Sequence, residues 1–68
     1  MATILVVEDD SGFRSLLRAI LSGEGYEVFE AATAQGAREQ SRVRKFDVLI
    51  SDLKLPDGDG LQVLRWFR

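Results

Sequence analysis

Two hydrophobic patterns alternate along this chain: unbroken apolar runs, and apolar residues at helical spacing. Residues 3–7 (Thr-Ile-Leu-Val-Val) form such a run, which is typical of a strand covered on both faces of a parallel sheet. Ser11 then offers an N-cap for a helix that Gly23 and Gly25 end. The apolar positions of this helix share one face: Phe13, Leu16, Leu17, Ile20 and Leu21.

The middle of the chain repeats this change of pattern. Residues 26–32 form a shorter strand of mixed polarity that suits a sheet edge. Thr33 caps a second helix that extends to Lys45, although Gly36 lowers its helix propensity. Residues 47–52 then predict a third strand.

A loop to Gly60 separates the third strand from the last element. Leu61, Leu64 and Phe67 have the spacing of a third helix, which has no visible end in the sequence. We expect Phe67 in the core and the adjacent Trp66 in a contact between molecules.

The order of elements is therefore βαβαβα, which predicts an α/β fold. Helix-length connections are required only between parallel strands. Right-handed crossovers favour the strand order 2-1-3, with residues 3–7 in the centre. This order places a switch point at the carboxyl ends of the first and third strands, where ligands bind in open α/β sheets.

Acidic residues follow both strands that meet at the switch point. Glu8, Asp9 and Asp10 come directly after the first strand, and Asp52 ends the third. Adjacent strands lie about 4.8 Å apart, so Asp9 and Asp52 can approach within reach of one ion. Each like-charge pair at roughly 5 Å costs on the order of 3 kcal/mol at an effective dielectric of about 20, so a cation is expected to offset the repulsion.

Composition limits the chemistry of such a site. The 68 residues contain no cysteine and no histidine, which excludes disulfides, histidine catalysis and most zinc sites. Oxygen ligands leave Mg²⁺, Mn²⁺ or Ca²⁺, and an open carboxylate cluster suits Mg²⁺, which keeps several waters. Asp52 is the candidate nucleophile, since carboxylates form aspartyl-phosphates.

Charge and hydropathy exclude several partners. The net charge of −2 does not fit a nucleic-acid-binding domain. The local basic residues are interpreted as a solvated helix face: Arg38, Arg42, Arg44 and Lys45. No apolar run approaches the roughly 20 residues that span a bilayer, and the N-terminus lacks a basic leader pattern, which predicts a cytoplasmic chain.

The segment after Asp52 is interpreted as a turn. Asp57 and Asp59 do not fit an EF-hand, because neither starts a loop with the required acids and a glutamate at its twelfth position. Gly58 and Gly60 lack the spacing and the lysine of a phosphate-binding loop. We expect both aspartates to act as turn formers.

Together these pieces resemble the receiver domain of two-component response regulators. The resemblance is carried by Glu8-Asp9-Asp10 after the first strand, Asp52 after the third, and residues 56–60 (Pro-Asp-Gly-Asp-Gly) beyond it. It spans the whole chain in order and spacing. It implies a flavodoxin-like (CheY-like), partial doubly wound parallel sheet.

The resemblance also implies roles for individual residues. Asp52 accepts a phosphoryl group from a sensor histidine kinase or a small phospho-donor, as a stoichiometric acceptor and not as an enzyme. Asp9 and Asp52 bind Mg²⁺ directly, with Mn²⁺ as a substitute. Glu8 helps through a water, the backbone carbonyl of Lys54 completes the protein ligands, and Asp10 is a neighbour of the site.

This family continues with two more strands, which supply a Ser or Thr and then a Lys that contact the phosphoryl group. Residues 1–68 contain neither strand and are therefore expected to be a truncated receiver domain that ends within its third helix. Lys54 belongs to a different element and is not expected to replace the later lysine. Weak metal binding, slow or absent phosphorylation and no normal switch are predicted.

A second hypothesis is a self-associating half-domain without signalling activity. The strand at residues 47–52 would have an open apolar edge, which recruits further strands, so we expect a homo-oligomer that pairs there. A third hypothesis, a flavodoxin-like enzyme that binds a nucleotide or flavin, has little support. There is no phosphate loop, and an acidic pocket repels an anionic cofactor.

Overall fold

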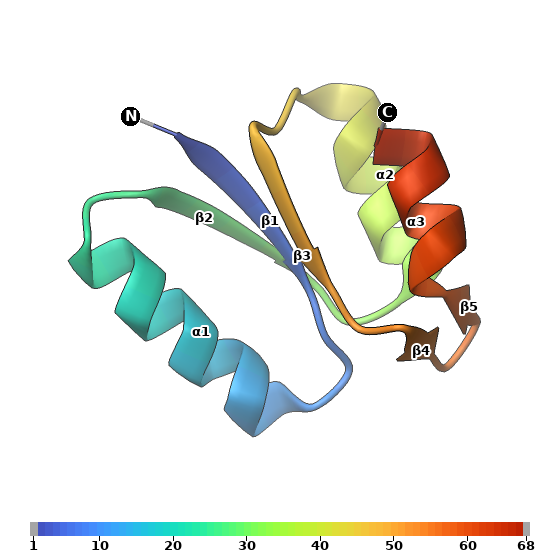
Figure 1. The fold of residues 1–68 in the computed structure, drawn as a ribbon, viewed down its shortest axis with the longest axis horizontal. Coiled ribbons are helices and arrows are strands. Elements are labelled where there is room, and N and C mark those ends of the chain that lie inside the picture. The colour runs from blue at the N-terminus through green and yellow to red at the C-terminus, as the bar shows by residue number, and fades with distance from the viewer. Residues whose placement is uncertain (1, 68) are drawn as a thin grey trace.

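A computed structural model describes residues 2–67 of the chain. Three longer strands alternate with three helices, and two short strands precede the last helix (Figure 1). The elements are β1 (Thr3–Val7), α1 (Ser11–Gly23), β2 (Glu27–Ala31), α2 (Ala34–Val43), β3 (Val48–Ser51), β4 (Lys54–Leu55), β5 (Gly58–Asp59) and α3 (Gly60–Phe67). The predicted βαβαβα order is confirmed, with β4 and β5 as an addition.

The main sheet is parallel and has the predicted order β2-β1-β3. Helix α1 covers one face of this sheet, and α2 and α3 lie together on the other (Figure 1). Val7 at the end of β1 pairs with Ala31 of β2 and with Ser51 of β3. The three strands therefore end level with one another, and the residues that follow them share one edge of the sheet.

The core is divided by the central strand into two clusters. Alternate residues of β1 point to opposite faces, as the pleat of a strand requires. The cluster under α2 and α3 comprises Leu5, Val7, Ala31, Ala34, Ala37, Leu55 and Val63. The smaller cluster under α1 comprises Ile4, Val6 and Val28, with Leu17, Leu21 and Ile50 packed against it. All four apolar residues of β1 from Ile4 on are buried, which confirms it as the covered central strand.

The apolar stripe predicted for α1 is only partly covered. Leu17 and Leu21 pack against the sheet, but Phe13, Leu16 and Ile20 are 48%, 53% and 55% exposed. No residue of α1 is buried. The reason is that, within residues 2–67, one helix covers this face of a three-stranded sheet, so three of the five residues in its apolar stripe have little to pack against.

The N-caps of the first two helices illustrate one error and one success of the sequence analysis. Asp10, and not Ser11, caps α1: its backbone is extended and its carboxylate accepts a hydrogen bond from the Phe13 backbone N–H at 2.9 Å. Both residue types favour this position, and the helix simply starts one residue earlier than predicted. Thr33 caps α2 as predicted, since its hydroxyl accepts from the Gly36 N–H at 2.9 Å.

Helix α2 is shorter than predicted. It ends at Val43, because Arg44 has an extended backbone while its N–H still donates to the Gln40 carbonyl. Lys45 therefore lies beyond the helix. Within residues 2–67, no helix combines the length and the apolar composition that crossing a membrane requires.

The basic residues are exposed as predicted, but two of them also stack on aromatic rings. The guanidinium of Arg38 lies 5.2 Å from the centre of the Trp66 ring, and that of Arg44 lies 4.0 Å from the Phe29 ring. Such cation–π contacts are an intramolecular use of these side chains. A contact between molecules at Trp66 stays a prediction, and the predicted core position of Phe67 falls on a side chain outside those that the structure describes.

Candidate functional site

The first half of the site comes from the end of β1. The backbone N–H of Glu8 donates to the Ala31 carbonyl at 3.0 Å and so continues the pairing of β1 with β2. The side chain of Glu8 is only 6% exposed, whereas Asp9 is exposed. The sheet thus fixes a buried carboxylate directly beside an accessible one.

The second half comes from the end of β3. The Asp52 N–H donates to the Val7 carbonyl at 3.1 Å, which sets the start of the acidic loop against the centre of the sheet. The first residue of α3, Gly60, lies against the backbone of Asp52. A Cβ atom added to Gly60 would fall well inside van der Waals contact of the Asp52 carbonyl oxygen. The glycine therefore permits α3 to approach the backbone of Asp52 as closely as it does.

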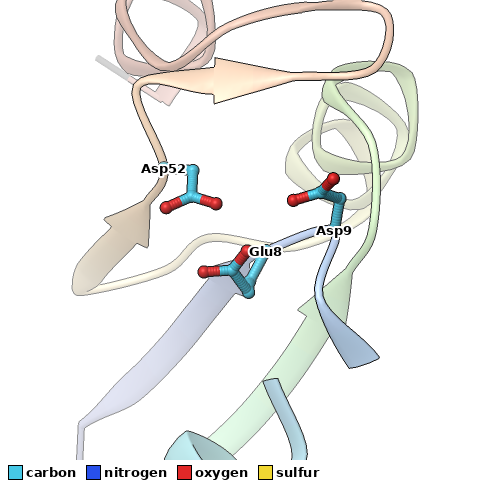
Figure 2. A group of neighbouring side chains, drawn as sticks. All are labelled: Glu8, Asp9 and Asp52. Atoms are coloured by element: carbon cyan, nitrogen blue, oxygen red, sulfur yellow. The ribbon is translucent and has the colours of Figure 1, made fainter. Parts of the chain in front are cut away.

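Three carboxylates converge where these two strand ends meet. Oxygens of Glu8, Asp9 and Asp52 all lie within 4.8 Å of one another. Figure 2 shows the side chains of Asp9 and Asp52 turned toward the same space, with Glu8 beneath them. The sequence pattern predicted that Asp9 and Asp52 meet with Glu8 or Asp10 beside them, and the family resemblance favoured Glu8.

The charges of this cluster suit a divalent cation. The Asp52 carboxylate accepts a hydrogen bond from protonated Glu8 and thereby raises the pKa of Glu8, and burial, the Asp52 charge and Asp9 act in the same direction. A raised pKa means that the ionised form of Glu8 is disfavoured by its surroundings. A cation would remove this penalty, because it compensates the charge that the carboxylates share.

No basic side chain performs this compensation among residues 2–67. The ion pairs of that region join Arg14 and Arg18 to Glu30 on β2, with the Arg14 guanidinium 3.4 Å from the Glu30 carboxylate. Arg14 also donates to the backbone carbonyl of Glu8 at 2.7 Å. Arg14 therefore holds the β1–α1 turn in place without pairing with the carboxylates themselves.

The donor set also fits the chemistry of Mg²⁺. Mg²⁺ prefers oxygen ligands at about 2.0 to 2.1 Å, so two of its ligands lie roughly 3 to 4 Å apart. The observed separations are close enough that small rotations of the side chains reach this geometry. One carboxylate is exposed and one is half-buried, which leaves room for waters and for a phosphate oxygen.

Asp10 stands apart from the cluster. Its carboxylate is engaged as the N-cap of α1, and its N–H donates to Glu8 Oε2 at 3.2 Å. The backbone N–H of Asp10 thus holds the Glu8 carboxylate, while one carboxylate oxygen of Asp10 is occupied at the start of α1. This arrangement agrees with its predicted position as a neighbour.

Lys54 lies in β4, two residues beyond Asp52, and its side chain is exposed. The expected loop is therefore partly ordered as a ribbon, in which Lys54 pairs with Asp59 and Leu55 with Gly58. The turn of the ribbon is Pro56-Asp57, which confirms a turn position for Asp57. Asp59 is in β5 at the end of the ribbon.

Both aspartates of the ribbon have a role that the sequence analysis missed. Asp59 accepts from the Gln62 N–H at 2.8 Å and so caps α3, a role that its place three residues before Gln62 could have indicated. Asp57 accepts from the N–H groups of Ala34 and Gln35 at 2.7 and 2.9 Å. These N–H groups belong to the start of α2, and no local sequence signal could have revealed that contact.

Comparisons with known proteins agree with this geometry. A family model described as "Response regulator receiver domain" matches residues 4–68. The KDP operon transcriptional regulatory protein KdpE of Escherichia coli K12 is 46% identical over 68 residues, which are 100% of this chain and 30% of that protein.

Solved structures give the same result at the level of the fold. The non-phosphorylated HemR receiver domain from Leptospira biflexa has a TM-score of 0.88 and 37% identity, over 96% of this chain and 52% of that one. The response regulator TrrA from Thermotoga maritima, solved in complex with Mg²⁺-BeF, has a TM-score of 0.86 and 36% identity, over 93% of this chain and 55% of that one. The chain therefore spans about half the length of these receiver structures.

Proposed function

Because this chain belongs to the family of response regulator receiver domains, we propose that Asp52 is its phosphoacceptor and that the site works with Mg²⁺. The observation that carries the proposal is the meeting of Glu8, Asp9 and Asp52 within 4.8 Å at the carboxyl ends of β1 and β3. This is the edge at which α/β sheets of this type bind their ligands. The meeting of the half-buried Asp52 with two further carboxylates supports the proposal.

In this proposal the carboxylates have different tasks. Asp9 and Asp52 are direct ligands of Mg²⁺, and the buried Glu8 acts through a water. The backbone carbonyl of Lys54 is the remaining protein ligand. The Mg²⁺ complex of TrrA supports the choice of ion, since that relative is 36% identical to this chain over the part that matches. When bound, the ion supplies positive charge that offsets the repulsion between the carboxylates and an incoming phosphoryl group.

The transfer itself uses Asp52. One carboxylate oxygen forms a bond to phosphorus while the bond from phosphorus to the donor's leaving group breaks, and that group departs with the electron pair. The product is an aspartyl-phosphate. Asp52 is half-buried, so its carboxylate keeps some exposure to solvent, from which a donor would approach. The reaction is stoichiometric, so we do not propose an enzyme with turnover.

The proposed donor is a sensor histidine kinase, or a small phospho-donor in its place. A cytoplasmic location stays a prediction. The Ser or Thr and the Lys that the family resemblance implies would come from later strands, which these 68 residues do not contain. Removing one fixed donor to a reacting group costs about 10² to 10³ in rate elsewhere, so the 68-residue chain is expected to react slowly.

Acetyl phosphate with Mg²⁺ gives the test of this proposal. Intact mass should show slow addition of one phosphoryl group to the 68-residue chain, loss of the addition in Asp52→Asn, and loss on chelation of Mg²⁺. Asp59→Asn is the matched control, because it makes the same substitution in the neighbouring segment and should be labelled like the unmodified chain. Equal labelling of Asp52→Asn, or no labelling of a folded chain over long incubation, contradicts the proposal.

We also propose that the 68-residue chain associates through β3. Within the described residues β3 pairs only with β1, and its free edge adjoins a groove of about 190 Å³ lined by apolar side chains. These are Leu49, Leu53, Leu61 and Leu64, with Ser51 and Gly60 beside them. An open apolar edge favours pairing with another strand.

Sedimentation at increasing concentration tests the association. A concentration-dependent dimer or larger oligomer is expected, and Val48→Lys at the edge should shift it toward monomer because a charge on an edge strand opposes pairing. A monodisperse monomer at high concentration contradicts this second proposal and leaves the first untouched.

A further inference from the structure

The side chain of Asp57 forms hydrogen bonds near the site with residues that are far from it in the sequence. Its two carboxylate oxygens accept hydrogen bonds from the N–H groups of Ala34 and Gln35, which are 23 and 22 residues away in the sequence. These N–H groups lie in the first turn of α2, where they have no partner within the helix. The contact therefore joins the turn of the β4–β5 ribbon to the start of α2.

This contact completes a second connection between the two halves of the site. The first connection runs through the sheet, where the Asp52 N–H donates to the Val7 carbonyl. The second starts at Glu8, whose N–H donates to the Ala31 carbonyl just before α2, and continues through Asp57 into the ribbon that follows Asp52. Without Asp57, the ribbon is tied to α2 by apolar packing of Leu55 against residues such as Ala34.

We propose that Asp57 is a positioning residue for the cation site, because its carboxylate fixes the ribbon that carries the Lys54 carbonyl relative to Glu8 and Asp9. The proposal rests on the function proposed above and adds a residue that does not touch the ion. Apolar packing alone has little directionality, whereas two charge-assisted hydrogen bonds set both position and orientation. Partners that orient metal ligands from outside typically contribute 10- to 100-fold to metal affinity.

The test measures the affinity of the 68-residue chain for Mn²⁺ alone by electron paramagnetic resonance. Asp57→Asn keeps one carbonyl acceptor and Asp57→Ala keeps none, so we expect affinity to fall by about threefold and about tenfold respectively. Asp59→Asn removes the same charge from the same ribbon but from the cap of α3, and should bind Mn²⁺ within twofold of the unmodified chain. Equal losses in the Asp57 and Asp59 variants would show a general charge effect and overturn the inference.

Asp52→Asn separates this inference from the proposed function. If Asp52→Asn binds Mn²⁺ as tightly as the unmodified chain, the cation site itself is refuted. If Asp52→Asn loses affinity while both Asp57 variants keep it, only the positioning role is refuted. Circular dichroism under the binding conditions establishes that each variant is folded.

A second measurement uses only the unmodified chain, so it does not depend on whether a variant folds. If the contact of Asp57 with α2 strengthens cation binding, cation binding must strengthen that contact by the same factor. Mg²⁺ is the ion for this measurement because it is diamagnetic. Saturating Mg²⁺ should slow amide exchange of Ala34 and Gln35 by about tenfold, the factor expected for Asp57→Ala. Amides of α1 away from the site, such as that of Ile20, should not change. Exchange at Ala34 and Gln35 that is unaffected by Mg²⁺ overturns the inference.

Discussion

The ends of β1 and β3 bring acids to the same site, but the protein holds them in different ways. β1 pairs on both sides, its apolar residues are buried, and Glu8 continues the pairing. β3 pairs on one side, its residues are half-buried or exposed, and the ribbon with its polar contacts follows. The difference teaches that one half of the site is fixed by the core and the other half by hydrogen bonds and close backbone packing.

Truncation of two paired leucines should give the largest difference in stability between β1 and β3. Leu5 of β1 and Leu49 of β3 are register partners, yet Leu5 is fully buried and Leu49 only partly. Leu5→Ala should cost about 4 kcal/mol of unfolding free energy, and Leu49→Ala about 2 kcal/mol, because less apolar area is lost at the edge. Urea unfolding measures both, and equal losses contradict the contrast.

The close approach of α3 to Asp52 gives the next largest effect. Gly60→Ala should cost about 2 kcal/mol, because the new methyl group meets the backbone of Asp52, which no side-chain rotation can relieve. Gly23→Ala is the control, since a Cβ at Gly23 has open space around it and helix propensity favours alanine. Urea unfolding should separate the two variants in opposite directions. A neutral Gly60→Ala would show that β3 and α3 are free to move apart.

The raised pKa of Glu8 predicts a smaller effect of opposite sign. Glu8→Gln should raise the unfolding free energy of the metal-free chain near neutral pH, by less than Gly60→Ala lowers it, because it removes a charge that the Asp52 carboxylate and burial disfavour. Thermal unfolding with a chelator present measures it, and Glu24→Gln on the surface is the control. A loss of stability in Glu8→Gln contradicts the view that the ionised form of Glu8 destabilises the metal-free fold.

The smallest predicted effect depends on pH. Hydrogen bonds from the Gln35 and Ala34 N–H groups lower the pKa of Asp57 below its ordinary value of 3.8. A lowered pKa in the folded state gives stability that is present above 3.8 and is lost as the pH falls through the folded value. The unfolding free energy of the unmodified chain should therefore exceed that of Asp57→Asn near neutral pH, and the gap should close in acid below that range. A gap that stays constant into strong acid contradicts a role for the ionised carboxylate.

The sequence predicted the parts of this molecule that follow from periodicity and topology. Apolar runs that end in acids marked β1 and β3, and parallel pairing alone brings Glu8, Asp9 and Asp52 to one edge. The pattern also predicted Thr33 as a cap, because capping is a local interaction between residues close in sequence.

The features that the sequence did not predict depend on tertiary context. The exposure of Phe13, Leu16 and Ile20 depends on how much surface the rest of the fold offers to α1, and hydrophobic periodicity carries no information on that. The contact of Asp57 with α2 joins segments 23 residues apart and has no sequence signature. Asp57 could therefore be recognised as a turn residue but not as a link between the ribbon and α2.

The most direct test of the central claim, that the ends of β1 and β3 form one cation site, is a double-mutant cycle on Mn²⁺ affinity. The variants are Asp9→Asn, Asp52→Asn and the two combined, with affinity measured on the folded 68-residue chain. Ligands of one ion depend on each other, so each single variant should lose about tenfold or more in affinity and the double variant should lose clearly less than the product of the two. Losses that multiply independently, or affinities that neither substitution changes, would contradict a single shared site.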